Sequence, residues 1–496
     1  MDQKLNKSAH KILFINTFAF TICFACWMLN GVLVTYLVDN QVFDWDPAEI
    51  GWLMGIPVLT GAIFRLPLGI LTDKYGGRPV FGILLLLSAI PMFFLSMADS
   101  YLVYALCSFG FGLTGASFAV GIAFTSYWYP KERQGIALGI FGAGNAGAAL
   151  TTFLAPTMLN YLTNDGADID AWRYLPQIYA AVLVIIGILF LVLVKNKKPE
   201  TSSKNLLQLI TPLKHIRVWR FGLYYALVFG MFVSFSQWLI PYFVNVYYLP
   251  LVTAGVFAAL FSFPSGAIRV LGGWMSDKWG ARKVMYWVLG TSVVFSLMMS
   301  IPKMDITTPG NGVLAQSNGE VTFVSDTLII AGGIKHKIIQ KPVKIKKETK
   351  DEFHIFPVKT AWQTREVEVG DVVKKKELLA KGETHIMFQA NVWIFAVLAI
   401  ILGSIWGIGK AAVYKHIPEY YPNEVGVVGG MVGLIGGLGG FVGPIIFGYL
   451  LKYTGLWTTC WMFMLLLSCL CLFWMHRVIA KMMKKEVPML MRKIEH

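Results

Sequence analysis

Charged residues are scarce in this chain. Only 14% of its 496 residues are Asp, Glu, Lys or Arg, whereas 56% are hydrophobic, and the mean hydropathy is +0.60. Soluble domains carry about a quarter charged residues, so the composition excludes an ordinary soluble protein and indicates an integral membrane protein. The formal charge of +15 would favour a nucleic-acid partner on a soluble chain. In a membrane protein the position of each charge matters more than the sum, and we expect no nucleic acid.

Cysteines are also few, and they form no recognisable framework. All six lie in apolar runs, and the Cys23–Cys26 pair has CxxC spacing without a nearby His or carboxylate. We interpret this pair as packing thiols rather than as a metal or redox centre. The sequence offers no nucleophile–base pair, no metal-ligand cluster and no buried carboxylate dyad, which argues against an intramembrane enzyme. We therefore expect no metal, no cofactor and no enzymatic activity.

Long apolar runs are what the chain has in abundance. Runs of about twenty residues, each long enough to cross a bilayer as a helix, recur along nearly the whole sequence. They predict twelve transmembrane spans, the ninth of them at 283–302. The first run, at about 12–38, is too long for a cleavable signal peptide, and no small-residue cleavage site follows it.

Basic and acidic loops alternate between successive spans. The loops after the even-numbered spans are basic, whereas those after the first, third and fifth spans carry mainly Asp and Glu. Cytoplasmic loops of membrane proteins collect Lys and Arg. The alternation therefore predicts a multi-pass protein of the cell inner membrane with both termini in the cytoplasm.

One polar segment, residues 303–388, interrupts the apolar pattern. It is rich in Lys and Glu, and it alternates hydrophobic and polar residues in the manner of β-strands, as at Val367 and Val369. The span count places this insert outside the cytoplasm, where a long domain is translocated whatever its charge. The stretch VEVGDVVKKKELLAKGETHI resembles the turn of biotinyl and barrel-sandwich domains, but it lacks the sequence context of a modified lysine.

The chain also contains an internal repeat. FRLPLGILTDKYGGRPV at 64–80 matches IRVLGGWMSDKWGARKV at 268–284, with seven identical residues and a constant offset of 204. Two parallel halves with a substrate site between them are a transporter plan. The predicted fold is an all-α polytopic membrane protein with twelve transmembrane helices in two pseudo-symmetric six-helix halves and a small β-rich extracytoplasmic insert. Its parts are an N-terminal half at 1–194, a cytoplasmic linker at 195–218, a C-terminal half at 219–302 and 389–496 with a basic tail, and the insert at 303–388.

The repeated G-x-x-x-D-K-x-G-x-R loops resemble the signature of the major facilitator superfamily, and the resemblance covers nearly the whole chain apart from the insert. It implies that Asp73 and Asp277 cap neighbouring helices. It also implies that Arg78 and Arg282 form ion pairs that hold the outward-facing state closed. A simple excess of cytoplasmic charge would not explain the fixed spacing of Gly and Asp.

Two arginines lie deep within spans. Arg65 precedes Asp73 by eight residues, which is about 12 Å of helix, and Arg269 occupies the matching place in the second half. A charge at that depth is costly and marks a functional site by default, although a structural arginine paired with a carboxylate is the alternative. The sequence places no Asp or Glu deep in any span. The pair therefore predicts an anion site, and the planar guanidinium suits a planar oxyanion.

Glycine-rich stretches in the fifth and eleventh spans add a second indication. FGAGNAGAALTTFLAP surrounds Asn145 with glycines, and GGMVGLIGGLGGFVGP mirrors it. Such glycines allow close helix packing, and they also expose backbone to a ligand. Together with the arginines, these stretches resemble the signature motifs of the nitrate/nitrite porter family. That resemblance implies that Arg65 and Arg269 clamp the anion and that the remaining substrate-binding residues are Asn145, Phe118, Tyr225, Phe229, Gly144 and Gly147.

Lys410, within the tenth span, is a departure from those members of the family that are exchangers, which carry a small polar residue, often Asn, at this place. A lysine buried beside two arginines offers a route to proton coupling, so proton–nitrate symport is the first hypothesis and nitrate/nitrite exchange the second. The alternative for Lys410 is contact with a backbone carbonyl or with the cytoplasmic vestibule. Two other functions stay open, namely a facilitator for another small anion and a membrane sensor that uses the insert. We expect a monomer whose partners are nitrate or nitrite, protons and the lipid bilayer.

Overall fold

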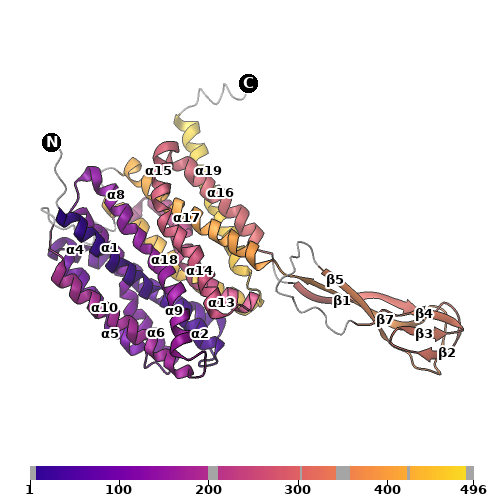
Figure 1. Ribbon diagram of the computed structural model, residues 1–496. Coiled ribbons are helices and arrows are strands. Elements are labelled where there is room, and N and C mark those ends of the chain that lie inside the picture. The colour runs from indigo at the N-terminus through magenta and orange to yellow at the C-terminus, as the bar shows by residue number, and fades with distance from the viewer. Residues whose placement is uncertain (1–6, 199–210, 302–303, 342–357, 422–424, 487–496) are drawn as a thin grey trace. The chain divides into compact units, whose positions relative to one another are not determined.

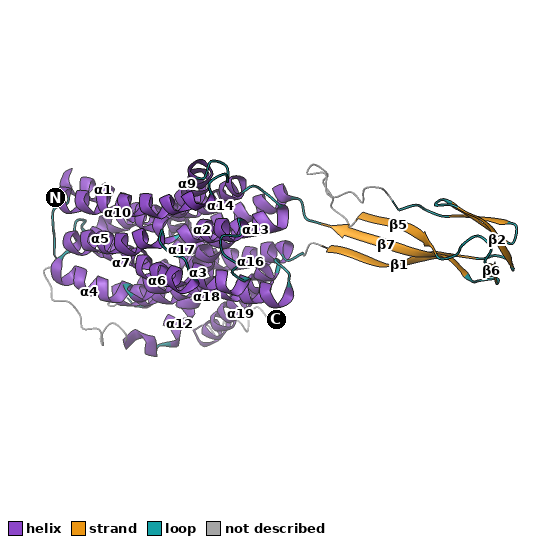
Figure 2. Cartoon of the chain, turned by 90° about the horizontal axis from the view of Figure 1, so that it is seen from below, coloured by secondary structure: helices purple, strands orange, loops and turns teal. Residues whose placement is uncertain are grey.

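The computed structural model describes residues 7–198, 211–301, 304–341, 358–421 and 425–486, and it forms two compact units (Figure 1). One unit comprises Met1–Ser300 and Ala396–His496, and the other comprises Ile301–Phe395. Helices make up the first unit and strands the second, as Figure 2 shows. The helical architecture and the β-rich insert predicted from the sequence are confirmed. Half of the predicted linker, residues 199–210, lies outside the described residues.

The helical unit divides at the linker into two series of helices. The first series is α1 (Lys7–Trp27), α2 (Leu29–Asp39), α3 (Pro47–Ile63), α4 (Arg65–Tyr75), α5 (Gly77–Leu95), α6 (Tyr101–Phe111), α7 (Ser117–Ser126), α8 (Lys131–Gly142), α9 (Gly147–Leu162) and α10 (Tyr174–Leu193). The second series is α12 (Ile216–Tyr225), α13 (Met231–Tyr247), α14 (Leu251–Ala267), α15 (Arg269–Trp279), α16 (Ala281–Met299), α17 (Val392–Tyr420), α18 (Val425–Thr454) and α19 (Thr459–Glu486).

Several of these helices are consecutive parts of one span. Among the described residues, ten stretches are long and apolar enough to cross a membrane, and the bent pair α14–α15 makes an eleventh. The ninth predicted span corresponds to α16, which has 19 residues but is not among those stretches. The charged residues Arg282 and Lys283 at the start of α16 lower its mean hydropathy most, and Thr291 and Ser292 lower it further. The repeat nevertheless makes α16 the counterpart of α5, which does qualify as a span.

The internal repeat is visible in the element boundaries. A shift of 204 residues maps α3 onto α14, α4 onto α15 and α5 onto α16, residue for residue at both ends. The loop glycines Gly76 and Gly280 have φ angles of +90° and +85°. Residues other than glycine are strained at such angles, which explains why both copies of the loop carry glycine there. The repeat therefore encodes the same helix–turn–helix geometry twice.

Six of the spans are interrupted along their length in the described part of the chain. The helix is interrupted at Met28, Phe64 and Ile268 in three of these spans. At Ile268 the two helical parts are bent by 44°. Short 3₁₀ segments at Gly112–Ala116 and Ala143–Ala146 interrupt two more, and a π-helical turn at Ala226–Gly230 lies between α12 and α13. By contrast, α17, α18 and α19 are continuous. Such interruptions often mark functional sites, because they redirect side chains and free backbone groups.

The two halves pack tightly away from the repeated loops. A Cβ atom on Gly51 of α3 would lie 2.4 Å from the carbonyl oxygen of Pro444 in α18, and one on Gly255 of α14 would lie 2.3 Å from that of Thr152 in α9. Glycine is therefore needed for these contacts between halves. Towards the repeated loops the packing is open, since a Cβ on Gly69 or Gly273 would have no heavy atom within 4 Å.

The insert is a pair of antiparallel sheets. Its strands are β1 (Met304–Leu314), β2 (Gly319–Val324), β3 (Leu328–Ala331), β4 (Ile334–Lys337), β5 (Val358–Arg365), β6 (Val372–Val373) and β7 (Leu378–Phe388). One sheet has the order β1-β7-β5 and the other β4-β3-β2-β6. A small apolar core that includes Val321, Ile329 and Leu379 lies within this unit. The insert thus has a core of its own, as an independent domain requires.

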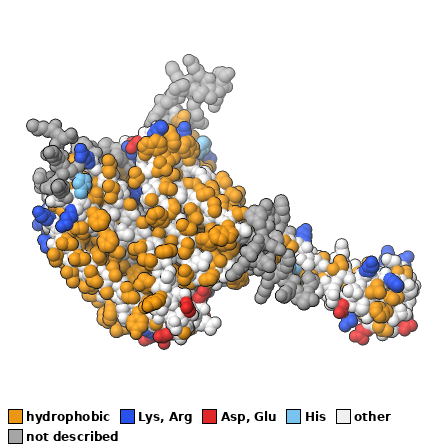
Figure 3. All heavy atoms as spheres, in the orientation of Figure 1, with side chains coloured by type: hydrophobic (Ala, Val, Ile, Leu, Met, Phe, Trp, Pro, Cys, Tyr) orange, Lys and Arg blue, Asp and Glu red, His pale blue; other side chains and the backbone are white. Residues whose placement is uncertain are grey.

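The outer surface of the helical unit matches a bilayer. Hydrophobic side chains cover most of its visible face, with Lys and Arg gathered towards one end and Asp and Glu towards the other (Figure 3). Large apolar residues are widely exposed there, among them Phe14 at 73% and Ile185 at 55%. Soluble monomers rarely show such a contiguous apolar surface.

Candidate functional site

The two arginines of the repeat occupy equivalent positions at breaks in their spans. Arg65 is the first residue of α4, after the break at Phe64, and Arg269 is the first residue of α15, after the break at Ile268. In each case the arginine directly follows a helix break, and at Arg269 the two helices are bent by 44°. The placement of both arginines is thus set by the same local geometry in the two halves.

Arg65 is buried, with 5% of its surface exposed. Its Nη1 donates a hydrogen bond of 2.7 Å to the carbonyl oxygen of Gly433 in α18, so the side chain reaches across to the other half. Its Nε is buried and has no hydrogen-bond partner. The guanidinium therefore keeps an unused donor in a place where unused donors are expensive.

Arg269 is half-buried, and its Nη1 is likewise buried without a hydrogen-bond partner. A Cβ on Gly142, at the end of α8, would lie 3.3 Å from this nitrogen. Glycine at 142 therefore leaves room for the guanidinium of the opposite half. In the part of the chain that the structure describes, no carboxylate lies within ion-pair distance of Arg65 or Arg269.

Aromatic rings connect the cationic side chains. The ring centroid of Phe118 lies 5.5 Å from Cζ of Arg65 and 5.9 Å from Cζ of Arg269, so one ring serves both guanidinium groups. Phe229, in the π-helical turn, lies 5.5 Å from Cζ of Arg65 and 5.8 Å from Nζ of Lys410. Aromatic faces attract cations, so these rings help to hold positive charge without supplying a competing anion.

Lys410 is completely buried in α17. Its Nζ donates a hydrogen bond of 2.9 Å to Oγ of Ser265 and lies 3.2 Å from the ring centroid of Phe232. The lysine therefore contacts a hydroxyl and an aromatic face, rather than the backbone carbonyl or vestibule of the alternative interpretation. Three cationic side chains thus surround one group of aromatic rings.

Asn145 lies in the 3₁₀ segment between α8 and α9, and it is 1% exposed. Both its side-chain nitrogen and its side-chain oxygen are buried without a hydrogen-bond partner. A buried primary amide in that state is unusual, because each unmade hydrogen bond costs free energy. Gly142 on one side of it faces Arg269, and Ala146 on the other side lies against Gly266 of α14.

The structure places Gly144 and Gly147 against α1. A Cβ on Gly144 would lie 2.4 Å from the ring of Phe20, and one on Gly147 would lie 2.1 Å from the carbonyl oxygen of Thr21. These contacts account for both glycines by helix packing. The neighbouring Gly142 is the glycine that approaches an arginine.

Tyr225 stacks on Phe229, with ring centroids 5.0 Å apart. It also makes an edge contact at 5.0 Å with Tyr414, a residue that the sequence interpretation did not single out. The Tyr414 ring lies 5.8 Å from Cζ of Arg269, and its hydroxyl donates to the carbonyl oxygen of Gly429 at 3.1 Å. Tyr414 follows Lys410 by four residues, which is one helical turn, and this spacing could have identified it from the sequence.

Trp27, Phe232 and Ser265 were also missed. The Trp27 ring lies 5.9 Å from Cζ of Arg65, and the other two residues contact Lys410. Aromatic and small polar residues are common in membrane helices. Nothing in the sequence distinguishes these three from ordinary packing residues.

The repeated loops make different contacts in the two halves. Tyr127 donates a hydrogen bond to Asp73, whereas Asp277 pairs with Lys415. Burial raises the pKa of Tyr127, and its hydrogen bond to Asp73 and the negative charge of Asp73 raise it further. The phenol therefore stays protonated and acts as the donor. Nε of Arg78 donates to the carbonyl oxygen of Leu191 at 2.6 Å, at the C-terminal end of α10.

Arg282 differs from its counterpart. Its Nη2 donates to the hydroxyl of Tyr420 at 2.8 Å. The ion pairs that Arg78 and Arg282 are expected to form in the outward-facing state stay a prediction. Across the described residues, neither arginine has a carboxylate within ion-pair distance here.

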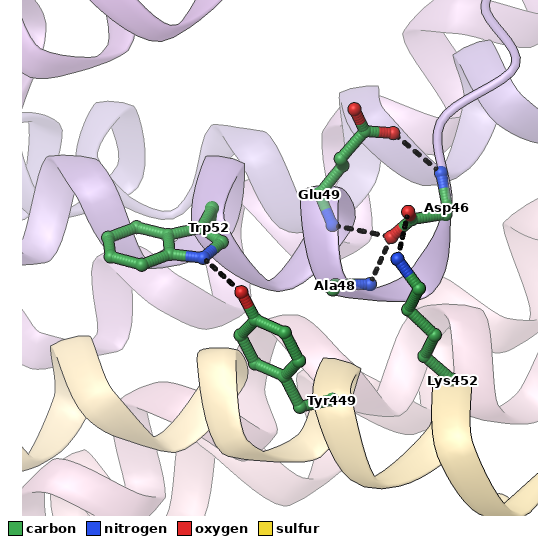
Figure 4. A network of polar contacts seen from close by, with 6 residues as sticks. All are labelled: Asp46, Ala48, Glu49, Trp52, Tyr449 and Lys452. Carbon is green, nitrogen blue, oxygen red and sulfur yellow. Dashed lines mark hydrogen bonds and ion pairs between the residues drawn. The ribbon is translucent and has the colours of Figure 1, made fainter.

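At the other end of the unit, a polar network joins the two halves (Figure 4). Oδ1 of Asp46 accepts hydrogen bonds from the backbone N–H groups of Ala48 and Glu49. The Glu49 carboxylate in turn accepts one from the backbone N–H of Asp46, which completes a capping box for α3. Nζ of Lys452 lies 2.8 Å from Oδ2 of the same carboxylate. One residue thus starts α3 and binds the end of α18.

The sequence is similar to those of known proteins over most of its length. Residues 15–324 match the family model described as Major Facilitator Superfamily. A "Probable nitrate/nitrite antiporter NarK1" of Thermus thermophilus is 35% identical over 484 residues, which cover 96% of this chain and 93% of that protein. A "Nitrite extrusion protein" of Bacillus subtilis is 29% identical over 62% of this chain and 76% of its own length.

Solved structures show the same fold at much lower sequence identity. A bacterial homologue of the human lysosomal transporter Spinster superposes with a TM-score of 0.63 at 13% identity, over 95% of this chain and 97% of that one. The nucleoside transporter NupG gives a TM-score of 0.58, also at 13% identity. At this identity the likeness concerns the fold alone.

Proposed function

The chain belongs to the Major Facilitator Superfamily, and from this premise we propose that it transports nitrate, and nitrite as well, across the membrane by alternating access. The observation that carries the proposal is the arrangement of Arg65 and Arg269. The guanidinium groups come from equivalent helix breaks in the two halves, and both face the ring of Phe118. Each keeps a buried nitrogen without a hydrogen-bond partner.

The chemistry of this arrangement supports a small planar anion. A guanidinium presents its N–H donors in one plane, which matches the oxygens of nitrate or nitrite. Phe118 and Phe229 offer flat faces beside the anion, and Asn145 supplies buried polar atoms that have no partner of their own. An organic substrate would need a larger cavity with more varied polar groups. The names of the similar proteins from Thermus thermophilus and Bacillus subtilis support the same substrates.

Movement of the two halves is supported by their uneven packing. Contacts such as Gly51–Pro444 and Gly255–Thr152 close one side of the site, while the positions of Gly69 and Gly273 are open on the other. Rocking of one half against the other around the site would exchange the closed and open sides. Asp73, Arg78, Asp277 and Arg282 of the repeated loops would form the gate that closes the open side.

Coupling to protons is the first candidate for the driving force. Lys410 is buried, contacts Ser265 and Phe232, and lies near the arginines through the shared ring of Phe229. Release of its proton would remove one of three positive charges before the empty site returns. Rebinding of the proton with the next anion would give proton–nitrate symport.

Exchange of nitrate for nitrite is the second candidate, favoured by the antiporter name of the Thermus thermophilus relative. A site that keeps all its positive charges resists returning empty, because bare buried charges are expensive. A bound anion on each stroke would relieve that cost. In this case Lys410 would be a permanent part of the anion site, with its charge stabilised by the ring of Phe232.

We place the protein in the cell inner membrane as a monomer. The basic loops and both termini would lie in the cytoplasm, and the insert would lie outside it. Basic residues lie mainly towards one end of the helical unit and acidic residues towards the other, which supports this orientation (Figure 3).

Purified protein in liposomes tests the proposal. Net nitrate uptake into liposomes without internal anion, driven by an inward proton gradient, indicates symport. Uptake only with nitrite inside indicates exchange. Competition by chlorate and oxalate measures selectivity, and the absence of nitrate or nitrite transport in every arm would disprove the proposed substrate.

A further inference from the structure

A cationic cavity lies apart from Arg65 and Arg269, the two arginines at the helix breaks of the repeat. It opens at the end of the helical unit that carries the repeated loops, between α12, α16, α17 and α19. Arg220 and Arg282 line it from α12 and α16. The enclosed part of the cavity is small, about 20 Å³, and the space that includes its open mouth is about 320 Å³, so a bound group would lie mainly in the mouth.

Two buried polar groups in this cavity lack hydrogen-bond partners. Tyr224 is 2% exposed, and its hydroxyl makes no hydrogen bond. His416 is 4% exposed, and its Nδ1 makes none either, although Oε2 of Glu419 lies 3.8 Å away. Buried hydroxyl and imidazole groups are usually satisfied, so each of these points to a group that occupies the cavity.

The charge of the cavity indicates the sign of that group. Arg217 stacks over Tyr420 at 4.5 Å from Cζ to the ring centroid, and Arg282 donates to the hydroxyl of the same tyrosine. Three arginines therefore converge on one corner of the unit. Glu419 is the one carboxylate paired there among the described residues, and half of its side chain is exposed. The excess of positive charge therefore favours an anion as the group that binds in this cavity.

The wall formed by α19 indicates that the anion has an apolar part. Met475, Val478, Ile479 and Met482 line the cavity from that helix. Phe473 and Met483 of the same helix are 58% and 50% exposed on the surface that would face lipid. A soluble anion would gain nothing from these side chains, whereas an acyl chain would bury them.

We propose that this cavity binds a phosphate-bearing anion, namely the headgroup of an anionic phospholipid. The guanidinium groups of Arg220 and Arg282 and the hydroxyl of Tyr224 hold the phosphate, and an acyl chain lies along α19. Basic pockets between membrane helices bind acidic lipid headgroups in this manner. At Arg78, the counterpart of Arg282 in the N-terminal half, Nε donates instead to the backbone carbonyl oxygen of Leu191.

The site would link the lipid to the loop of the second repeat. Arg282 belongs to that loop, and its contact with Tyr420 joins α16 to α17, the helix that carries Lys410. A phosphate bound to Arg282 would strengthen this junction. The lipid would thus stabilise the C-terminal half where the N-terminal half uses its own backbone.

The test is a titration of the purified, delipidated full-length protein, with bound lipid counted by mass spectrometry of the intact protein. Phosphatidylglycerol should bind at least about tenfold more tightly than phosphatidylcholine. Arg220→Gln should weaken phosphatidylglycerol binding about tenfold, and Tyr224→Phe should weaken it a few-fold with an unchanged melting temperature. Arg477→Gln is the matched control, because this exposed arginine on α19 contacts Phe473 outside the cavity, and it should bind as the wild type does.

A parallel arm with inorganic phosphate separates the two sources of the phosphate. Competition that requires a large excess of phosphate supports the lipid, because the acyl chain contributes to affinity. Equal affinity for inorganic phosphate and phosphatidylglycerol would overturn the lipid assignment. Equal losses in Arg220→Gln and Arg477→Gln, or equal binding of phosphatidylcholine, would overturn the site itself.

Discussion

Lys452 Nζ lies 2.8 Å from Asp46 Oδ2, and this ion pair joins the end of α18 to the start of α3. The two helices belong to different halves of the helical unit and pack closely along their length through glycines such as Gly51 and Gly448. The pair therefore lies at the edge of the closed side of the site. Both side chains are roughly 40% exposed, so solvent screens their attraction.

Replacement of Asp46 separates its two roles. Asp46→Asn should lower stability by less than about 1 kcal/mol, because asparagine still caps α3 and only a screened ion pair is lost. Asp46→Ala should cost about 1 kcal/mol more, because the cap hydrogen bonds are lost as well. Thermal unfolding of the purified variants measures both. Equal melting temperatures for the two variants would contradict the capping role.

The same ion pair should depend on pH. Burial acts to raise the pKa of Asp46, but the hydrogen bond from Lys452 and those from the backbone of Glu49 and Ala48 outweigh it and hold the pKa below its usual 3.8. The contribution is therefore present above the usual pKa and is lost as pH falls through the lowered value. The difference in melting temperature between wild type and Asp46→Asn should stay constant from about pH 7 to about pH 5 and shrink as the pH falls through the usual 3.8 and below it. A difference that grows on acidification would refute this.

Arg65→Lys and Arg269→Lys should each reduce nitrate transport about tenfold to a hundredfold, because the charge is kept but the planar set of donors is lost. Initial rates in liposomes measure the effect. Arg173→Lys is the matched control, since this arginine pairs with Asp99 outside the site and its replacement should leave the rate unchanged. Near-normal nitrate uptake by Arg269→Lys would disprove the proposal that the two guanidinium groups clamp the anion.

Lys410→Asn distinguishes the two coupling modes. It should abolish uptake driven by a proton gradient while nitrate–nitrite exchange continues, because the group that carries the proton is gone. Phe232→Leu keeps the lysine and removes the ring 3.2 Å from its Nζ, so it should weaken transport without removing the dependence on the gradient. Gradient-driven accumulation of nitrate by Lys410→Asn would show that the lysine carries no proton.

Removal of residues 303–388, with the ends joined by a short flexible linker, should leave transport largely intact. The insert forms a compact unit with its own apolar core, and the corresponding connection between α5 and α6 is only a few residues long. Uptake per correctly inserted molecule is the relevant measurement. Lost activity in a variant that inserts and melts normally would assign the insert a part in transport or sensing.

Gly255→Ala should lower the melting temperature, because its Cβ would lie 2.3 Å from a backbone carbonyl oxygen of the other half. Overpacking of this kind costs about 1–3 kcal/mol. Gly290→Ala is the control, since a Cβ there has no heavy atom within 4 Å and alanine favours the helix. If both variants melt alike, the close contact between halves at Gly255 is not needed for stability.

Local sequence determined much of this molecule. Apolar runs specify spans because a bilayer demands continuous helical hydrogen bonding. The repeat fixed the equivalence of Arg65 and Arg269, and glycine at 76 and 280 fixed the turns, since these positions have φ near +90° and +85°. The periodicity of the insert likewise indicated strands. Each of these features depends on neighbours along the chain, which a sequence displays directly.

Tertiary structure alone decided which residues meet. Phe118 contacts both arginines, Tyr414 joins the site, and Ser265 and Phe232 hold Lys410, through contacts between segments remote in sequence. Gly144 and Gly147 look like their neighbour Gly142, yet they pack on α1 while Gly142 faces Arg269. The direction in which a helix face points is set by its packing partners, and a 3₁₀ or π-helical turn rotates that face. No pattern within a single span contains this information.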